Sequence, residues 1–394
     1  MEFSSEIFLN HLAQTTPQPF LIPVDHAEGV YIYTPDGKRY MDLISGIGVS
    51  NTGHRHPKVI DAIRRQLDKH LHVMVFGEYI QSTPNALAKK LAELLPSPLD
   101  CSYFVNSGTE ANEGALKLAK RYTQRTEIIS CWKSYHGSTH GSLSVSGNEE
   151  KKYAFRPLLP DVRFIEFNVA DDLDQITERT ACVIMETIQG DAGVRIPSRE
   201  YLQAVRKKCS EQGALLILDE IQCGMGRTGT LFAFQHFGIV PDILTMAKAF
   251  GGGLPIGAFI SSREIMNSLA HNPMLGHITT FGGNPVCCAS ALAALDVIAE
   301  EELLNHVEQK GRLIEALLAH PHIKEIRRMG LLLAIDFDSA ERVNRIVAEA
   351  KRNGVICYWF LSHPHSFRIA PPLTITEQEI REACAVILKA IENS

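Results

Sequence analysis

Short, almost wholly apolar runs alternate with helical segments from Pro57 onward. The runs that we predict as strands are CSYFV (101–105), EIISC (127–131), ACVIME (181–186), ALLILDE (214–220), ILTMAK (243–248) and GAFIS (257–261). Apolar strands that alternate with helices favour a mostly parallel sheet with helices on both faces. Ligands of such sheets gather at the carboxyl ends of the strands. We therefore predict an α/β fold whose functional residues follow these strands.

The two ends of the chain follow other patterns. Residues 29–42 alternate Val, Ile and Tyr around a Pro-Asp-Gly turn, which predicts a hairpin. After residues 284–285, Asn-Pro, long helical periodicity leads to a predicted strand pair around LLLAIDF (331–337) and FRIAPPL (367–373). We predict a large domain at residues 57–285 and a small α/β domain built from both ends, residues 1–56 and 286–394.

Composition excludes several classes of function. Lys and Arg total 39 against 45 Asp and Glu, with no basic run, so we expect no nucleic-acid partner. The first twenty residues lack the pattern of a secretion signal, and no apolar stretch of about 18 residues occurs, so we predict a cytoplasmic protein without membrane contact. Nine cysteines without a CxxC pair fit reduced thiols. GHRHP (53–57) lacks a further metal ligand at a suitable spacing, so we predict no metal site.

Two of the predicted strands end at candidate catalytic residues. Asp219 closes an apolar run; it could cap the following turn, or it could hydrogen-bond a ring nitrogen and keep that nitrogen protonated. Lys248 lies in an apolar run before three glycines, and burial there would lower its pKa, as an imine-forming amine requires. The alternative for Lys248 is a side chain that extends to solvent at a strand end.

Two further segments follow strands. In VNSGTEANEGALKLAKR (105–121), Gly108 and Thr109 begin a helix whose N-terminus could bind a phosphate, although Ser or Thr there is also the commonest N-cap. In SYHGSTHGSL (134–143), Tyr135 could stack on a planar heterocycle or lie on the surface.

Six motifs in this order resemble those of the class III (ω-type) aminotransferases, near the acetylornithine, 4-aminobutyrate and ornithine aminotransferases. They are SGTEAN (107–112), YHG (135–137), ETIQGDAG (186–193), LDEIQCGMGRTG (218–229), MAKAFGGGLPIGA (246–258) and TTFGGNP (279–285). The resemblance also covers the opening DGKRYMDLISGIGVSNTGHRHP and the closing FRIAPPLTIT, and so nearly the whole chain.

The resemblance implies a fold-type I enzyme that uses pyridoxal 5′-phosphate and acts as a homodimer with shared active sites. It implies that Lys248 carries the cofactor as a Schiff base and transfers the proton, and that Asp219 pairs with the pyridinium nitrogen. The other cofactor residues that it implies are Gln222 near the ring hydroxyl, Tyr135 on the ring, Gly108 and Thr109 at the phosphate, Thr280 from the other subunit and Glu186 in support. The implied reaction is a ping-pong transfer of an amino group to a keto acid, usually 2-oxoglutarate.

Four positions bear on the substrate. Arg368 matches the arginine that binds the α-carboxylate of glutamate in similar enzymes, and Asp191 stands where they have the glutamate that pairs with it. Ser138 replaces the arginine that holds the donor carboxylate in the 4-aminobutyrate and acetylornithine enzymes. Ile47 is similar to those two groups and differs from the tyrosine of ornithine aminotransferase. The donor stays open: a less acidic amine such as a diamine, or an acid held by another residue.

Two other functions are compatible with part of this pattern. An aminomutase or decarboxylase of the same fold would share the cofactor site, but Arg368 and Asp191 weigh against it. A catalytically silent regulatory protein that binds the cofactor would be expected to have an added DNA-binding segment or to lack Lys248.

Overall fold

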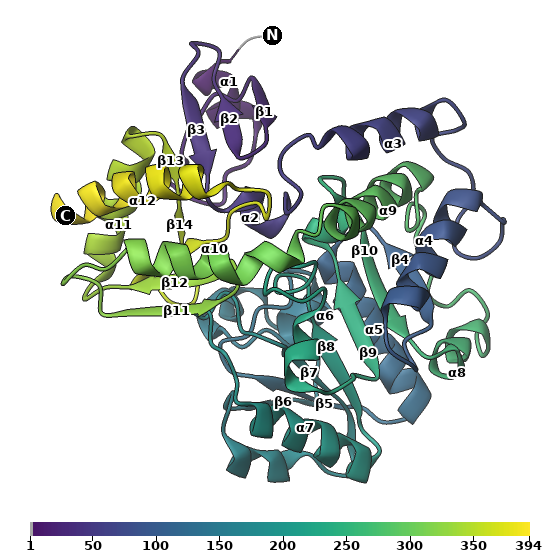
Figure 1. Cartoon of the computed structure of the whole chain (residues 1–394). Helices are drawn as coiled ribbons and strands as arrows, with labels where there is room; N and C mark the ends of the chain where they lie inside the picture. The colour runs from purple at the N-terminus through teal and green to yellow at the C-terminus, as the bar shows by residue number, and fades with distance from the viewer. Residues whose placement is uncertain (1–2) are drawn as a thin grey trace.

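The centre of the molecule is a seven-stranded sheet with the strand order β4-β10-β9-β8-β7-β5-β6, seen in a computed structural model that describes residues 3–394 (Figure 1). Its strands are β4 (Cys101–Val105), β5 (Glu127–Cys131), β6 (Val162–Ile165), β7 (Thr180–Glu186), β8 (Leu215–Asp219), β9 (Ile243–Met246) and β10 (Gly257–Ser261). Within the described residues, β10 pairs antiparallel with β4 and β9, and the other neighbouring strands of this sheet pair in parallel. The predicted mostly parallel sheet is confirmed, and β6 is an edge strand that the sequence analysis missed.

Both faces of this sheet are buried, which explains why its strands read as continuous apolar runs. In β7, Cys182 and Ile184 pack in the apolar cluster that includes α5, whereas Val183 and Met185 pack in the larger cluster on the other face. The helices are α1 (Ser5–His11), α2 (Ser45–Gly48), α3 (Pro57–Leu67), α4 (Ser82–Leu94), α5 (Gly108–Thr123), α6 (His140–Ser144), α7 (Arg199–Gln212), α8 (Arg263–Met266), α9 (Pro285–Glu300), α10 (Leu304–Leu317), α11 (Ala340–Arg352) and α12 (Glu377–Glu392).

Two smaller sheets adjoin the central one. One has the order β1 (His26–Glu28), β2 (Tyr31–Tyr33), β3 (Arg39–Asp42), β13 (Val355–Ile356), and the other the order β11 (Glu325–Met329), β12 (Leu332–Asp336), β15 (Ser366–Ile369), β14 (Tyr358–Trp359). The predicted hairpin is confirmed as β2 and β3, and the predicted strand pair as β12 and β15. Because β3 pairs in parallel with β13, the two ends of the chain share one sheet.

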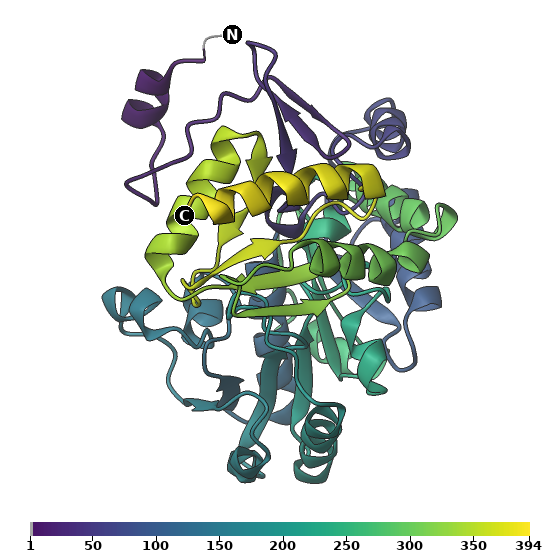
Figure 2. The same cartoon turned by 60° about the vertical axis from the view of Figure 1, so that its left-hand side comes forward.

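Figure 2 shows the N-terminal strands and the C-terminal helices on one side of the central sheet. Helix α9, which begins at the predicted domain boundary, packs against α3 and α4. The division into residues 1–56, 57–285 and 286–394 stays a prediction. Among residues 3–394, no helix combines the length and the apolar character needed to cross a membrane.

Candidate active site

Two adjoining cavities of about 510 and 550 Å³ lie beyond the carboxyl ends of the central strands. The predicted residues that line the first cavity are Gly108, Thr109, Tyr135, Ser138, Glu186, Asp191, Asp219, Gln222 and Lys248. The second cavity shares Tyr135, Asp191, Gln222 and Lys248 and adds Ile47 and Arg368. Thr280 is exposed and lines neither cavity. The fold therefore gathers the predicted residues at one place, with Thr280 as the exception.

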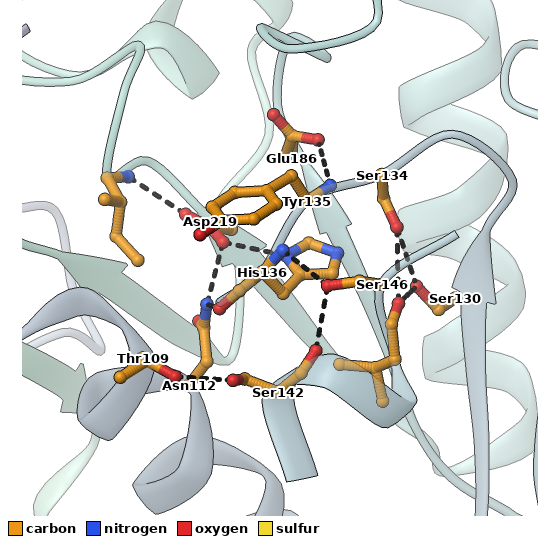
Figure 3. Close-up of polar contacts among 12 residues, drawn as sticks. Thr109, Asn112, Ser130, Ser134, Tyr135, His136, Ser142, Ser146, Glu186 and Asp219 are labelled. Atoms are coloured by element: carbon orange, nitrogen blue, oxygen red, sulfur yellow. Dashed lines mark hydrogen bonds and ion pairs between the residues drawn. The ribbon is translucent and has the colours of Figure 1, made fainter. Parts of the chain in front are cut away.

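Asp219 ends β8 and is almost fully buried. Its Oδ1 accepts a hydrogen bond from the backbone N–H of Ile221 at 3.0 Å. Its Oδ2 accepts from Asn112 Nδ2 at 2.9 Å and from His136 Nδ1 at 2.7 Å (Figure 3). Asp219 thus caps the next turn, which was the structural alternative for this residue. It also faces the first cavity, as a partner for a ring nitrogen would have to.

His136 and Asn112 are buried residues that the sequence analysis did not single out. Because a carboxylate only accepts hydrogen bonds, His136 Nδ1 must carry the hydrogen in the contact with Asp219. Asn112, on α5, also donates to the backbone oxygen of His136 at 2.7 Å. His136 Nε2 and Asn112 Oδ1 have no partner in the part of the chain that the structure describes. The histidine of the YHG motif was the available signal, whereas nothing in the sequence pointed to the Asn112 contact.

Lys248 follows β9 and begins a 3₁₀ turn, Lys248–Gly251. Its φ of 49° lies in the left-handed region, where a side chain is strained, and such strain gathers at functional sites. Burial lowers the pKa of the Lys248 amine, and the nearby charge of Arg368 lowers it further. A lowered pKa increases the neutral fraction, which is the nucleophilic form.

Glu186 ends β7 and fixes the loop that carries Tyr135. Its carboxylate accepts hydrogen bonds from the backbone N–H of Tyr135 at 3.0 Å and from that of Gly190 at 2.9 Å. Burial raises the pKa of Glu186 to about 7. A Cβ at Gly190 would lie 1.7 Å from Gln222 Oε1, so only glycine leaves room for the Gln222 side chain there.

The beginning of α5 has the features of an anion site. Ser107 caps the helix by accepting the backbone N–H of Glu110, so Thr109 is free of that role. Thr109 Oγ1 instead hydrogen-bonds Thr139 Oγ1 at 2.7 Å and contacts Ser142. A Cβ at Gly137 would lie 2.4 Å from Thr109 Oγ1, which shows how closely the two loops approach. Helix N-H groups and hydroxyls that converge in this way suit a phosphate.

Asp191 and Arg368 form a buried ion pair at 3.2 Å. Asp191 also accepts hydrogen bonds from the backbone N–H of Leu361 and the hydroxyl of Ser362, both at 3.2 Å. The Arg368 guanidinium lies over the ring of Phe360, 4.5 Å from its centroid, and burial lowers its pKa. The aspartate therefore reaches the arginine despite the shorter side chain.

Ile47 lies in α2, a tight turn in which it has a φ of 68°. Asp42 holds this turn by accepting the backbone N–H groups of Ile44 at 3.0 Å and Gly46 at 2.9 Å. His54 Nε2 binds the same carboxylate at 2.9 Å. In GHRHP, then, His54 supports a wall of the second cavity, and His56 pairs with Glu301 at 3.2 Å.

Ser138 is exposed at the edge of the first cavity, where its hydroxyl lies 3.3 Å from that of Tyr135. Among the described lining residues of that cavity, the basic side chains are Lys248 and His136. The sequence analysis also missed the aromatic residues Phe20, Tyr358 and Trp359, which line the second cavity, because they lie far apart along the chain.

Comparison with known proteins agrees with this geometry. Residues 12–391 match the family model described as aminotransferase class-III. The acetylornithine aminotransferase of Methanocaldococcus jannaschii is 40% identical over 370 residues, 90% of this chain and 89% of that protein. The enzyme of the same name from Bacillus subtilis is 39% identical over 376 residues, 94% of this chain and 95% of that protein.

Solved structures give the same result. The ornithine aminotransferase of Toxoplasma gondii superimposes with a TM-score of 0.91 at 30% identity, covering 98% of this chain and 93% of that one. That structure holds pyridoxal phosphate at partial occupancy in its active site. The chain belongs to the class III aminotransferases, enzymes that transfer amino groups with pyridoxal 5′-phosphate.

Proposed function

We propose that the enzyme moves an amino group from a primary amine to a 2-oxo acid such as 2-oxoglutarate, in a ping-pong cycle. The observation that supports this most is the Asp191–Arg368 pair, which lies in the same cavity as Lys248. An arginine there can bind a carboxylate in the acid half-reaction, and the aspartate can neutralise it when an amine without that carboxylate enters. One cavity can therefore accept both kinds of substrate in turn.

The residues present fit the cofactor. His136 Nε2 and Asn112 Oδ1 are buried without a partner among the described residues, beside the carboxylate of Asp219. Asp219 would hold a proton on the pyridine nitrogen. Tyr135 would lie on the ring and Gln222 near the ring hydroxyl, while Gly108 and Thr109 would bind the phosphate. When bound, pyridoxal phosphate supplies an electron sink for the charge that develops at the substrate carbon.

Lys248 is the proposed attachment point of the cofactor and the proposed proton carrier. Because its pKa is lowered, the freed amine is neutral more often, and it can take a proton from the substrate carbon. The same amine can then return that proton on the cofactor side. Glu186 would contribute by holding the loop of Tyr135 through its two backbone contacts.

We further propose a homodimer in which Thr280 joins the phosphate site of the partner. Two segments near Thr280 expose large apolar side chains: Leu71 and Ile80 in one, Met274 and Phe281 in the other. The segments touch, because Asn284 Nδ2 donates to the backbone oxygen of Leu71 at 3.0 Å. An apolar surface of this kind is typical of an interface, and a second copy would cover it. The cytoplasmic location stays a prediction.

The test is a set of separate half-reactions on cofactor-loaded protein. L-Glutamate and L-alanine are added without any keto acid, and the absorption of the lysine-bound cofactor is followed. Loss of that absorption, with release of the matching 2-oxo acid, supports the proposal. No spectral change with either amino acid would argue for an aminomutase, a decarboxylase or a silent protein.

A further inference from the structure

A third cavity, of about 460 Å³, lies at the C-terminal end of α5, the helix whose N-terminal end would bind the cofactor phosphate. Its fully charged lining residues within the described chain are Lys117, Lys120, Arg121 and Arg125, and none of its described lining residues is acidic. We name it the basic cavity. In a chain with a formal net charge of -6, it concentrates positive charge at one place.

A neutral histidine orients Lys117 in the basic cavity. Lys117 Nζ lies 3.0 Å from His277 Nδ1, and because an ammonium group only donates, that ring nitrogen is the acceptor. Burial and the charge of Lys117 both lower the pKa of His277, so its ring is mostly neutral at pH 7. The contact therefore fixes the ammonium group and leaves its charge uncompensated.

Backbone oxygens hold the two arginines. Arg121 Nε donates to the backbone oxygen of Ser268. Arg125 Nη1 donates to the backbone oxygens of Thr180 and Gln212, at 3.0 and 2.8 Å. These contacts use one nitrogen of each guanidinium, so each keeps a pair of neighbouring nitrogens for another ligand. Such a pair matches two oxygens of one phosphate group.

This arrangement places like charges close together. Lys117 lies three residues before Lys120 and four before Arg121 on α5, and like charges at these spacings destabilise a helix. The helix dipole favours cations in the last turn, where Lys120 and Arg121 lie. Arg125 lies beyond the end of the helix and Lys117 before its last turn, so the dipole does not explain the whole cluster.

Acidic residues that adjoin this end of α5 have other partners. Glu127, two residues beyond the last arginine of the cavity, pairs with Arg163 at 3.0 Å and with Arg179 at 3.5 Å. Glu264 accepts a hydrogen bond from the hydroxyl of Tyr122 at 2.7 Å. An anion from outside the chain would therefore meet cations that are already in position and still uncompensated.

We propose that the basic cavity binds a diphosphate, either the inorganic ion or the diphosphate group of a nucleotide. Arg121 and Arg125 would each bind one phosphate group, and the two lysines would balance the remaining negative charge. The cavity of about 460 Å³ has room for both forms. The site lies at the opposite end of α5 from Gly108 and Thr109, so it is separate from the cofactor site.

The competing occupant is a carboxylate of a partner subunit. Gly276 and His277 line the basic cavity and precede Thr280 by a few residues, so the cavity adjoins the proposed dimer interface. A partner carboxylate in the cavity would make the four cations part of that interface. Added diphosphate would then find the site filled.

Isothermal titration calorimetry on cofactor-loaded enzyme tests the inference with inorganic diphosphate, inorganic phosphate and ADP. The cofactor fills the phosphate site at the start of α5, so the titration reports on the basic cavity. We expect diphosphate to bind more tightly than phosphate by about tenfold or more, and its affinity to fall as salt is added. ADP that binds more tightly than diphosphate would identify a nucleotide as the ligand, and weaker binding would identify the inorganic ion. Absence of binding by both diphosphate and ADP overturns the inference.

Charge-reversing variants locate the site. Lys120→Glu should weaken diphosphate binding by about tenfold or more, because it removes a cationic contact and adds a repulsive charge. Lys324→Glu makes the same change at an exposed lysine outside the cavity and should leave the affinity unchanged. Lys120→Ala serves if Lys120→Glu fails to fold. Equal affinities in the Lys120 and Lys324 variants overturn the inference. So does a dimer that dissociates more readily in Lys120→Glu while the unaltered enzyme binds no diphosphate, since a partner carboxylate then fills the cavity.

Discussion

Replacing Asp219 with Asn removes one charge and leaves the shape of the side chain nearly unchanged. The carboxylate of Asp219 accepts hydrogen bonds from three donors, Ile221 on one oxygen and Asn112 and His136 on the other. An amide has a single oxygen, so whichever way it turns, at least one N–H faces another N–H. A buried donor without an acceptor costs about 1–3 kcal/mol, and we expect the melting temperature to fall by the corresponding few degrees.

The effect on the reaction should be larger. In the role proposed for Asp219, an amide could not hold a proton on the pyridine nitrogen by charge, so the charge that develops at the substrate carbon would lose its stabilisation. Removing one fixed electrostatic contact of this kind costs on the order of 10²–10³ in rate. Stopped-flow single turnovers with L-alanine would measure the loss, and cofactor titration would show that binding changes less. Asp171→Asn, the same chemical change at an exposed site, is the control. Equal single-turnover rates for Asp219→Asn and the unaltered enzyme would refute the pyridinium role.

Three further predictions follow from the site. Lys248→Ala should abolish turnover while a folded protein still binds the cofactor noncovalently, and full activity would end the assignment of Lys248. Gly190→Ala should weaken cofactor binding, because its Cβ would lie 1.7 Å from Gln222 Oε1. In a protein that already carries Gln222→Ala, adding Gly190→Ala should weaken cofactor binding no further. A further loss would contradict the steric explanation. Burial raises the pKa of Glu186 to about 7, so between about pH 4.5 and 7 the folded state binds a proton that the unfolded state has lost. The free energy of unfolding therefore falls as pH rises through this range. The melting temperature should therefore change less between pH 5 and 8 in Glu186→Gln than in the unaltered enzyme. An unchanged pH dependence would show that Glu186 does not cause it.

The sequence predicted the central sheet well because its strands are buried on both faces. The same burial made Asp219 and Lys248 recognisable as candidates, because a charged side chain at the end of a buried apolar run is uncommon without a structural or functional role. The edge strand β6 was missed because its four residues, VRFI, include an exposed arginine and give a weak pattern. An edge strand has one neighbour, so less of its sequence is constrained by packing.

The walls of the second cavity could not be predicted, for a different reason. Phe20 and Trp359 are separated by most of the chain, and each is an ordinary apolar residue in its own segment. Only the tertiary fold brings them together with Arg368. The contact of Asn112 with Asp219 was likewise invisible, because an asparagine inside a helix has no distinctive pattern in a single sequence.

The parallel pairing of β3 with β13 also has a consequence for biosynthesis. The ribosome completes all seven strands of the central sheet by residue 261, and the residues that line the first cavity end at Ile256, so this cavity can form while the chain is still growing. The strand that pairs with β3 emerges almost a hundred residues later, and Tyr358 and Trp359, which line the second cavity, follow it. Since such long-range pairing is a late step, the second cavity is completed after the central sheet.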